Sequence, residues 1–313
     1  MFVIHIVPAG DVGNQMLQLI YARALADRLG GARITGYDLP IWGLRAPDDK
    51  ARYHKPLIVG GHLQDPDLIV ALVKKFGLRA FYLRTFRFRV EDFPDRASIQ
   101  TLFDGGTADV EGFGDDVLVI NIRGLETLGG VHEDYGPLPF SYYRHLIERT
   151  GLKPVFMGQL GDDFYSKALR ARFPDARFVS SRGALGDFET IRRSKHIAIS
   201  VSTFSWLAAW LSDAATIHMP LSGMFNPAQR PEINLLPVGD HRYRFYAFPV
   251  RHWKGSDADI ADLSVEQTLQ ELKTADIEHR LRGAWRRTRL RRLRKRVSLY
   301  RKVAIAALRQ RWS

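Results

Sequence analysis

The chain contains no cysteine, which excludes both a disulfide framework and a thiolate metal site and suits a reducing compartment. Its first residues, MFVIHIV, include neither a basic segment nor a small-residue cleavage site, so we expect a first β-strand rather than a signal peptide. No apolar run approaches the roughly 18 to 20 residues that a membrane span requires. These absences predict a cytoplasmic protein, and a length of 313 residues favours two domains.

Acidic residues are scarce near the C-terminus. The whole chain carries 46 Lys and Arg against 34 Asp and Glu, a net charge of +12. Residues 278–313 hold 14 of the basic residues and one acidic residue, which leaves 32 basic and 33 acidic residues elsewhere. The body is therefore close to neutral, and the high isoelectric point says nothing about its active surface.

The basic C-terminal segment has the pattern of an amphipathic helix. Apolar residues recur at steps of three or four and should share one helix face: Leu290, Leu293, Val297, Tyr300, Ala304, Leu308 and Trp312. Arginines fill much of the remaining surface. This combination predicts that residues 278–313 bind an anionic membrane surface, which would make the protein peripheral on the inner face of the cell membrane.

Short apolar strands alternate with helical patterns along the chain. FVIHIV reads as a strand, a glycine-containing loop follows, and QMLQLIYARALADRLG has helical spacing. A second series starts near Glu111 with the strand VLVINI and closes with the strand HIAISV, the helix STFSWLAAWLSD and the strand ATIHMP. Alternation of this kind predicts an α/β protein with a doubly wound parallel sheet in each half and a cleft between the halves.

Three short segments could bind an anionic ligand. The first is the loop GDVGNQ between the first strand and its helix, where free backbone N–H groups favour an anion. It is neither a dinucleotide GxGxxG motif nor a Walker loop, which argues against NAD or ATP. The alternative is a tight turn capped by Asn14.

The second segment is NIRGLE, at the carboxyl end of a buried strand, where open α/β sheets bind ligands. Arg123 suits bidentate contact with phosphate. Glu126, three residues later, could act as a base, or the two side chains could simply form a salt bridge.

The third segment is the junction between HIAISV and STFSWLAAWLSD. Ser202, Thr203 and Ser205 could hold phosphate oxygens there, although Ser202 or Thr203 could equally be no more than an N-cap. We expect Trp206 and Trp210 to lie in the core. The triplet His132, Glu133 and Asp134 is capable of binding metal, but no second cluster and no DxD pair accompany it, so we predict no metal site.

These segments, in this order, resemble the α-1,2-fucosyltransferases of glycosyltransferase family 11. GDVGNQMLQLIYARALA is similar to the family's GxGNQMFQYAFARALA opening, and NIRGLE falls where the family has HIRRGDY. SKHIAISVSTFSWLAAWL is close to the family's CKHxIIxNSSFSWWAAWL, and LPFSYYRHLI matches a YY-containing helix in position. The resemblance extends in patches over about residues 1–220.

The resemblance implies a GT-B-like fold of two Rossmann-like domains facing a cleft, to which the basic C-terminal helix is added. We place the N-terminal, acceptor-side domain at 1–110 and the domain for the nucleotide-sugar donor at 111–255. At 256–277 we expect a helical segment that packs back on the rest of the protein. The basic amphipathic tail follows at 278–313.

The resemblance also implies roles for individual residues. Arg123 matches an arginine on the donor diphosphate. The other donor-side residues that it implies are Asn121, the turn Ser202, Thr203, Phe204 and Ser205, and the loop residues Gly13, Asn14 and Gln15.

The chain departs from the family's pattern in NIRGLE. Asn121 stands where the family has His, Gly124 replaces the second Arg, and Leu125-Glu126 replaces Gly-Asp. A donor other than GDP-fucose, held in the same pose, therefore stays open. For the base that deprotonates the acceptor hydroxyl, Glu126 comes first, followed by Glu133 and Asp134, with Asp11 on the N-terminal loop as a further candidate.

The sequence therefore predicts an inverting, metal-independent glycosyltransferase. It would need no cofactor and would move fucose or a related sugar from a nucleotide-sugar, GDP-fucose first, to a glycan or lipid-linked glycan in bacterial surface polysaccharide synthesis. Two alternatives stay open: a non-catalytic membrane-bound scaffold of the same fold, and a nucleic-acid-binding protein acting through the arginine-rich tail. A neutral body without an aromatic platform argues against nucleic acid as a partner.

Overall fold

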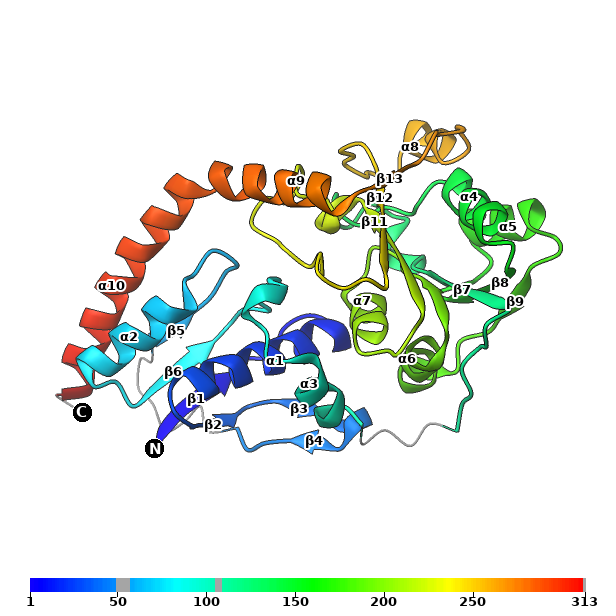
Figure 1. Cartoon of the computed structure of the whole chain (residues 1–313). Coiled ribbons are helices and arrows are strands. Elements are labelled where there is room, and N and C mark those ends of the chain that lie inside the picture. Colours follow the sequence, from blue (N-terminus) through cyan, green and yellow to red (C-terminus); the bar gives the residue numbers. More distant parts are fainter. Residues whose placement is uncertain (49–56, 105–108, 312–313) are drawn as a thin grey trace. The chain divides into compact units, whose positions relative to one another are not determined.

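A computed structural model describes residues 1–48, 57–104 and 109–311. The chain forms two compact units, each described here by itself (Figure 1). The first contains Met1–Gly106, Glu232–Leu235 and Gly283–Ser313, and the second contains Thr107–Pro231 and Leu236–Arg282. The C-terminal helical region, which we expected as a separate tail, is thus divided between the two units.

The first unit is built on a four-stranded sheet with the order β2-β1-β6-β5, in which all neighbouring strands are parallel. Its main elements are β1 (Phe2–Ile6), α1 (Val12–Arg28), β2 (Ala32–Thr35), β5 (Leu57–Val59), α2 (Pro66–Phe76), β6 (Ala80–Leu83) and α3 (Arg96–Leu102). A two-stranded antiparallel ribbon, β3 (Asp38–Leu39) and β4 (Leu44–Arg45), follows β2. Apolar residues of β1 and α1 are almost fully buried, so the first βα pair forms the centre of this unit's core.

The second unit is built on a seven-stranded sheet with the order β13-β12-β11-β10-β7-β8-β9. Its strands are β7 (Val117–Ile122), β8 (Lys153–Gly158), β9 (Arg177–Val179), β10 (His196–Ala198), β11 (Thr216–Leu221), β12 (Tyr243–Ala247) and β13 (Gln270–Leu272). Its helices are α4 (Phe140–Thr150), α5 (Phe164–Arg172), α6 (Gly183–Arg193), α7 (Thr203–Trp210) and α8 (Asp257–Asp262). Helices α4 and α5 lie on one face of the sheet and α6 and α7 on the other (Figure 1).

The predicted α/β class with two Rossmann-like units is confirmed, because both sheets are parallel at their centres and helices connect successive strands. The strand and helix patterns between residues 117 and 221 are also confirmed as β7 to β11 with α4 to α7 between them. Trp206 is fully buried and Trp210 nearly so, as expected for a core.

The segment after the predicted donor domain differs from the helical stretch that we expected at 256–277. It contains the short helix α8 and then β13, which pairs antiparallel with β12 at the sheet edge. A three-residue edge strand is stabilised by its neighbour's backbone hydrogen bonds, so its own residue pattern carries little signal.

The chain ends in two helices, α9 (Thr274–Arg287) and α10 (Arg289–Arg311), where a single helix was expected from residue 278. The break falls at Thr288, whose hydroxyl donates a hydrogen bond to the Trp285 carbonyl at 2.8 Å. A threonine that bonds back to a carbonyl one turn earlier offers the backbone an alternative to the helical ladder. Helix α10 packs on α2 in the first unit (Figure 1).

Candidate functional site

The second unit has a topological switch point between β7 and β10. From β7 the chain continues to β8 and β9 on one side, then returns through α6 to β10 on the other side and proceeds to β11. The loops that follow β7 and β10 therefore leave in opposite directions at the carboxyl edge of the sheet, which is where open α/β sheets form a ligand crevice.

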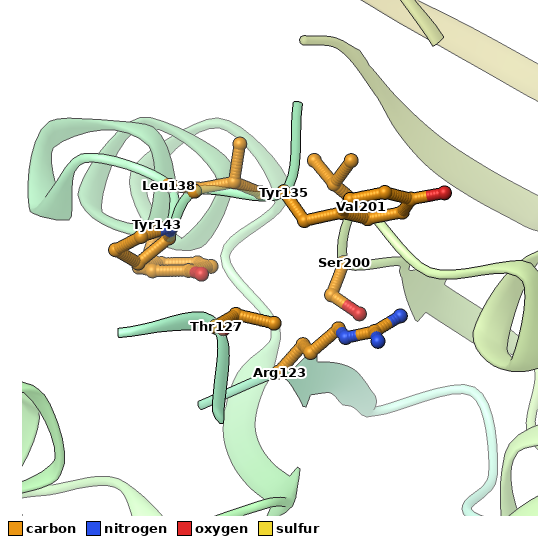
Figure 2. A pocket seen from close by; sticks show the side chains of 9 residues that line it. Arg123, Thr127, Tyr135, Leu138, Tyr143, Ser200 and Val201 are labelled. Atoms are coloured by element: carbon orange, nitrogen blue, oxygen red, sulfur yellow. The ribbon is translucent and has the colours of Figure 1, made fainter. Parts of the chain in front are cut away.

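A small pocket, partly open to solvent, lies at this edge. Arg123 follows β7 immediately, and Ser200 and Val201 follow β10. The remaining lining residues are Thr127, Tyr135, Gly136, Pro137, Leu138 and Tyr143. In Figure 2 the side chains of Arg123 and Ser200 are directed toward the same space, with the ring of Tyr135 beside it.

Arg123 is the cation of this pocket. Its side chain is half-buried, and its Cζ atom lies 5.2 Å from the centre of the Tyr135 ring. Burial raises the pKa of the Tyr135 hydroxyl, and the Arg123 guanidinium partly opposes that shift. The phenol therefore stays neutral and can donate a hydrogen bond, so the pocket presents a positive charge next to a neutral donor.

A buried hydrogen-bond cluster joins the ends of β7 and β10. Ser200 Oγ donates to Asn121 Oδ1 at 2.7 Å and lies 3.2 Å from Ser205 Oγ. All three residues are buried, Ser205 completely. Asn121 and Ser205, both expected on the donor, thus have their polar groups turned inward, where they fix the shape of the turn.

Ser202, Thr203 and Phe204 form the junction between the β10 loop and α7. Ser202 is the N-cap, and its Oγ accepts a hydrogen bond from the Phe204 backbone N–H at 3.2 Å. This is the N-cap alternative that the sequence left open. The first turn of α7 nevertheless lies at the same sheet edge as Arg123, because β10 and β7 are parallel neighbours.

The loop after Arg123 is held by polar contacts. The Gly124 N–H donates to Gln159 Oε1 at 3.1 Å, and Thr127 Oγ1 donates to the Gly124 carbonyl at 3.0 Å. Glu126 lies in the short 3-10 helix Leu125–Thr127, but its side chain is outside the part of the chain that the structure describes. Its expected role as a base therefore stays a prediction.

The other candidate bases of the second unit lie in different surroundings. Asp134 accepts hydrogen bonds from Gln229 at 2.7 Å and from Arg230 at 2.6 Å. Glu133 is exposed and lies 3.6 Å from the His252 ring nitrogen. Asp134 thus anchors the loop that carries Tyr135, whereas the Glu133 carboxylate is accessible to solvent.

The expected N-terminal loop lies in the first unit and is shorter than predicted. Helix α1 already begins at Val12, which places Gly13, Asn14 and Gln15 in its first turn, and Asp11 is an exposed N-cap without a side-chain cap hydrogen bond. Gly10 carries the turn with a positive φ of 68°. Gly13 is buried in this first turn.

A glutamine that the sequence did not single out closes this turn. Gln18 is fully buried; its amide nitrogen donates to the Val7 carbonyl at 3.0 Å, and its oxygen accepts from the Ala9 N–H at 3.1 Å. The N-terminal turn is therefore fixed from behind by α1, which leaves its outer side exposed at Asp11.

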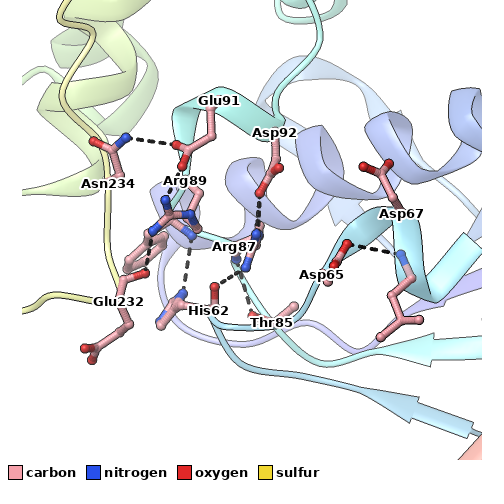
Figure 3. Close-up of polar contacts among 12 residues, drawn as sticks. His62, Asp65, Asp67, Thr85, Arg87, Arg89, Glu91, Asp92, Glu232 and Asn234 are labelled. Carbon is pink, nitrogen blue, oxygen red and sulfur yellow. Dashed lines mark hydrogen bonds and ion pairs between the residues drawn. The ribbon is translucent and has the colours of Figure 1, made fainter. Parts of the chain in front are cut away.

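The first unit also contains a buried polar cluster that the sequence did not predict (Figure 3). Arg87 donates from Nε to Asp92 Oδ2 at 2.6 Å and also donates to the His62 carbonyl. Arg89 pairs with Glu91 and donates to the Glu232 carbonyl at 3.3 Å. These groups satisfy one another, which is the arrangement of a structural network.

Within residues 1–48, 57–104 and 109–311, no group of three or more His, Asp or Glu side chains is placed to hold a metal ion. No helix in these ranges is long and apolar enough to cross a membrane.

The pocket contains residues that the sequence reasoning missed. Tyr135 directly follows the triplet that we considered for metal binding. Gln159, which follows β8, does not line the pocket but holds the loop after Arg123. Ser200 belongs to the cluster of small polar residues before α7, and the number of hydroxyl groups in that cluster was the sequence feature that could have indicated it. Tyr135 and Gln159 had no such feature, because their positions beside Arg123 and Gly124 depend on long-range packing.

A scan of the sequence against protein-family models finds no match, and neither does a search of curated proteins. Among solved structures the chain is similar to E. coli heptosyltransferase WaaC with ADP, with 12% identity and a TM-score of 0.34, over 70% of this chain and 87% of that one. This likeness is too distant to support an activity. The resemblance to α-1,2-fucosyltransferases rests on the sequence motifs.

Proposed function

We propose that this chain is a glycosyltransferase that binds a nucleotide-sugar at the carboxyl edge of its second unit. The observation that carries the proposal is the position of Arg123, next to the switch point between β7 and β10. A ligand in that crevice would meet the guanidinium from one strand and the start of α7 from the neighbouring strand. The start of α7 lies within the segment SKHIAISVSTFSWLAAWL, which resembles a motif of the α-1,2-fucosyltransferases.

Arg123 would contact the diphosphate of the donor and stabilise it as it leaves. A guanidinium matches phosphate oxygens in a bidentate manner, and the N-terminal end of a helix favours negative charge. The Tyr135 ring beside Arg123 would restrict the guanidinium to a small range of orientations. Pre-positioned positive charge is the main requirement for departure of a nucleoside diphosphate.

The finer part of the proposal is an inverting, metal-independent transfer of fucose or a related sugar to a glycan. One carboxylate would then deprotonate the acceptor hydroxyl. Glu126 is the first candidate because it follows Arg123 by three residues. Asp134 is less suited, since both its oxygens accept hydrogen bonds from Gln229 and Arg230. The replacement of the family's His by Asn121 keeps donors other than GDP-fucose in consideration.

Nucleotide-sugar binding can be tested by a thermal-shift panel of GDP-, UDP-, dTDP- and CMP-linked sugars. One nucleotide class should raise the melting temperature of the wild-type protein. Arg123→Ala should bind that donor about 10- to 100-fold more weakly, because it loses charge-assisted hydrogen bonds. Arg182→Ala is the matched control, since Arg182 is an exposed arginine of the same unit at the start of α6.

Transfer is then measured by chromatography of the released nucleoside diphosphate with candidate glycan acceptors. Glu126→Gln should retain donor binding and lose turnover. A donor shift that survives in Arg123→Ala would remove Arg123 from the site. Absence of a shift with every nucleotide class would overturn the glycosyltransferase proposal and favour a non-catalytic scaffold.

A further inference from the structure

Helix α10 exposes a continuous apolar stripe on the surface of the first unit. Leu290 is 69% exposed, Val297 65% and Leu308 59%, and Leu293 and Tyr300 are also exposed. With 3.6 residues per turn these five positions fall within about 80° of one another around the helix axis. The stripe therefore runs along most of the helix.

A different face of α10 attaches the helix to the protein. Leu299 and Val303 are buried, as are Ala306 and Ala307, and the helix packs on α2, where the Tyr300 ring also lies 5.6 Å from that of Phe76. The centre of this face lies about 120° around the axis from the centre of the stripe. Leu290, Leu293, Val297 and Leu308 are therefore not needed to attach α10, and residues of this size left in water call for another partner.

The residues that flank the stripe are arginines. Arg294 and Arg301 lie along one side of it and Arg289 and Arg296 along the other, at helical angles of about 40° or less from its edges. All four are exposed, and no ion pair is described for them within residues 1–48, 57–104 and 109–311. The sequence of α10 contains no acidic residue. Positive charge thus borders the apolar stripe on both sides.

We infer that α10 lies on an anionic phospholipid surface, with Leu290, Leu293, Val297 and Leu308 of the stripe inserted among the acyl chains. The flanking arginines would bind lipid phosphates, since their long apolar stems let the guanidinium reach the headgroups while the stripe is immersed. Because Leu299 and Val303 hold the helix on α2, it binds as a pre-folded element of the first unit. This inference does not depend on the proposed sugar transfer.

Charge complementarity favours lipid over the other possible occupants. A second copy of this helix would bring two acid-free basic surfaces together, which is electrostatically unfavourable. Nucleic acid would engage the arginines but leave the apolar stripe in water, because a duplex presents phosphates rather than apolar surface to a basic helix. An anionic bilayer satisfies both features at once.

The test is co-sedimentation of the full-length protein with vesicles of phosphatidylcholine, with and without phosphatidylglycerol. We expect binding to the anionic vesicles and little binding to the neutral ones. The double variant Arg294→Gln, Arg301→Gln should lower the partition coefficient about 30-fold. Its matched control is Arg23→Gln, Arg182→Gln, which removes the same charge from exposed sites on α1 and at the start of α6.

The apolar part is tested by Leu290→Ser, Val297→Ser, which should weaken anionic-vesicle binding on the order of 10- to 100-fold. Val131→Ser, Val265→Ser changes exposed residues of the second unit and is its control. Equal losses in variant and control would overturn the inference. So would a dimer in analytical ultracentrifugation that only the stripe variant disrupts, or tight binding to duplex DNA without vesicle binding.

Discussion

Ser200 Oγ donates a hydrogen bond to Asn121 Oδ1 at 2.7 Å, and this contact ties together the carboxyl ends of β10 and β7. Both residues are buried. The two loops that line the pocket leave the sheet immediately after these positions, one through Arg123 and the other through Val201. The spacing between the two walls of the pocket is therefore set inside the protein, behind the ligand crevice.

A double-mutant cycle measures this contact. Asn121→Ala and Ser200→Ala should each lower the free energy of unfolding by about 1–3 kcal/mol, because each leaves a buried polar partner unsatisfied. The double variant should lose less than the sum, with a coupling of about 1 kcal/mol in urea unfolding. Ser194→Ala combined with Asn121→Ala is the control pair, because Ser194 precedes β10 at its opposite end and bonds to Phe113 and Thr190. Coupling of equal size in both pairs would refute the proposed link.

The loop that carries Tyr135 depends on a glycine elsewhere in the chain. Gly223 has a φ of +54°, and a Cβ atom there would lie 2.0 Å from the Asp134 carbonyl oxygen. Gly223→Ala should therefore destabilise the protein by about 2 kcal/mol or more and weaken donor binding by displacing Tyr135 from Arg123. Gly239→Ala is the matched control, since nothing lies within 4 Å of a Cβ there. Thermal unfolding measures the stability, and titration calorimetry with the nucleotide-sugar that the thermal-shift panel selects measures the affinity. Unchanged affinity in Gly223→Ala would show that Tyr135 is not required.

Stability should fall on acidification because of His218. This residue is buried in β11, with its Nδ1 atom 2.9 Å from the Tyr246 hydroxyl. Burial, followed by the charge of Arg244, lowers the pKa of His218 to about 3. Between that value and the ordinary histidine pKa of about 6.5, only the unfolded chain binds the proton. The free energy of unfolding should therefore decrease by about 1.4 kcal/mol per pH unit through this window.

His218→Asn should remove that contribution. Urea unfolding at neutral pH and at about pH 5 should show a smaller difference for the variant than for the wild-type protein. His279→Asn, the same change at an exposed position of α9, controls for the loss of a histidine. A wild-type pH dependence that persists in His218→Asn would assign the effect to other groups.

The attachment of α10 should depend on Leu299 of its buried face and not on Leu293 of the stripe. Leu299 is 3% exposed where α10 packs on α2, whereas Leu293 is 50% exposed. Leu299→Ala should lower the free energy of local opening of α10 by about 2–5 kcal/mol through lost burial and a cavity. Leu293→Ala, the same substitution on the stripe, should change it by less than about 0.5 kcal/mol. Native-state hydrogen exchange of the α10 amides measures the effect of each substitution. Equal effects of Leu299→Ala and Leu293→Ala would contradict the assignment of the Leu299 face as the one that attaches α10.

Cation–π contacts of Trp285 also attach the C-terminal helices to the first unit. The Trp285 ring lies 3.9 Å from the Arg89 guanidinium carbon and 3.8 Å from that of Arg292. Trp285→Leu should remove both cation–π contacts and lower the stability of the first unit by about 1–2 kcal/mol. Trp253→Leu is no suitable comparison because Trp253 is buried in the other unit; Trp285→Phe, which keeps an aromatic face, is the informative control. Trp285→Phe should lose less stability than Trp285→Leu, although it should still be less stable than the wild-type protein. A loss of stability in Trp285→Phe as large as in Trp285→Leu would argue against the cation–π contribution.

The sequence by itself determined the first βα pair of the first sheet, the central strands of the second sheet, and the place where the candidate site would lie. Period-two and buried apolar patterns mark β7 and β10, and helical spacing marks α4 to α7, because these signals are local and repeat over many residues. Arg123 could be placed at a strand end for the same reason. Open parallel sheets bind ligands at the carboxyl ends of their strands, so this edge could be named from the sequence, whereas the switch point beside β7 required the strand order.

Only the tertiary structure decided which of the neighbouring side chains line the pocket and which face inward. The sequence offered Asn121 and Ser205 as ligand contacts, yet their polar atoms face inward, and Tyr135 reaches Arg123 from a loop. The apolar repeat of the C-terminal helix was also visible in the sequence, but it could not show that a second face, containing Val303, is the one that packs on α2. Periodicity states which residues share a face, whereas the opposing surface, which is distant in sequence, determines which face is buried.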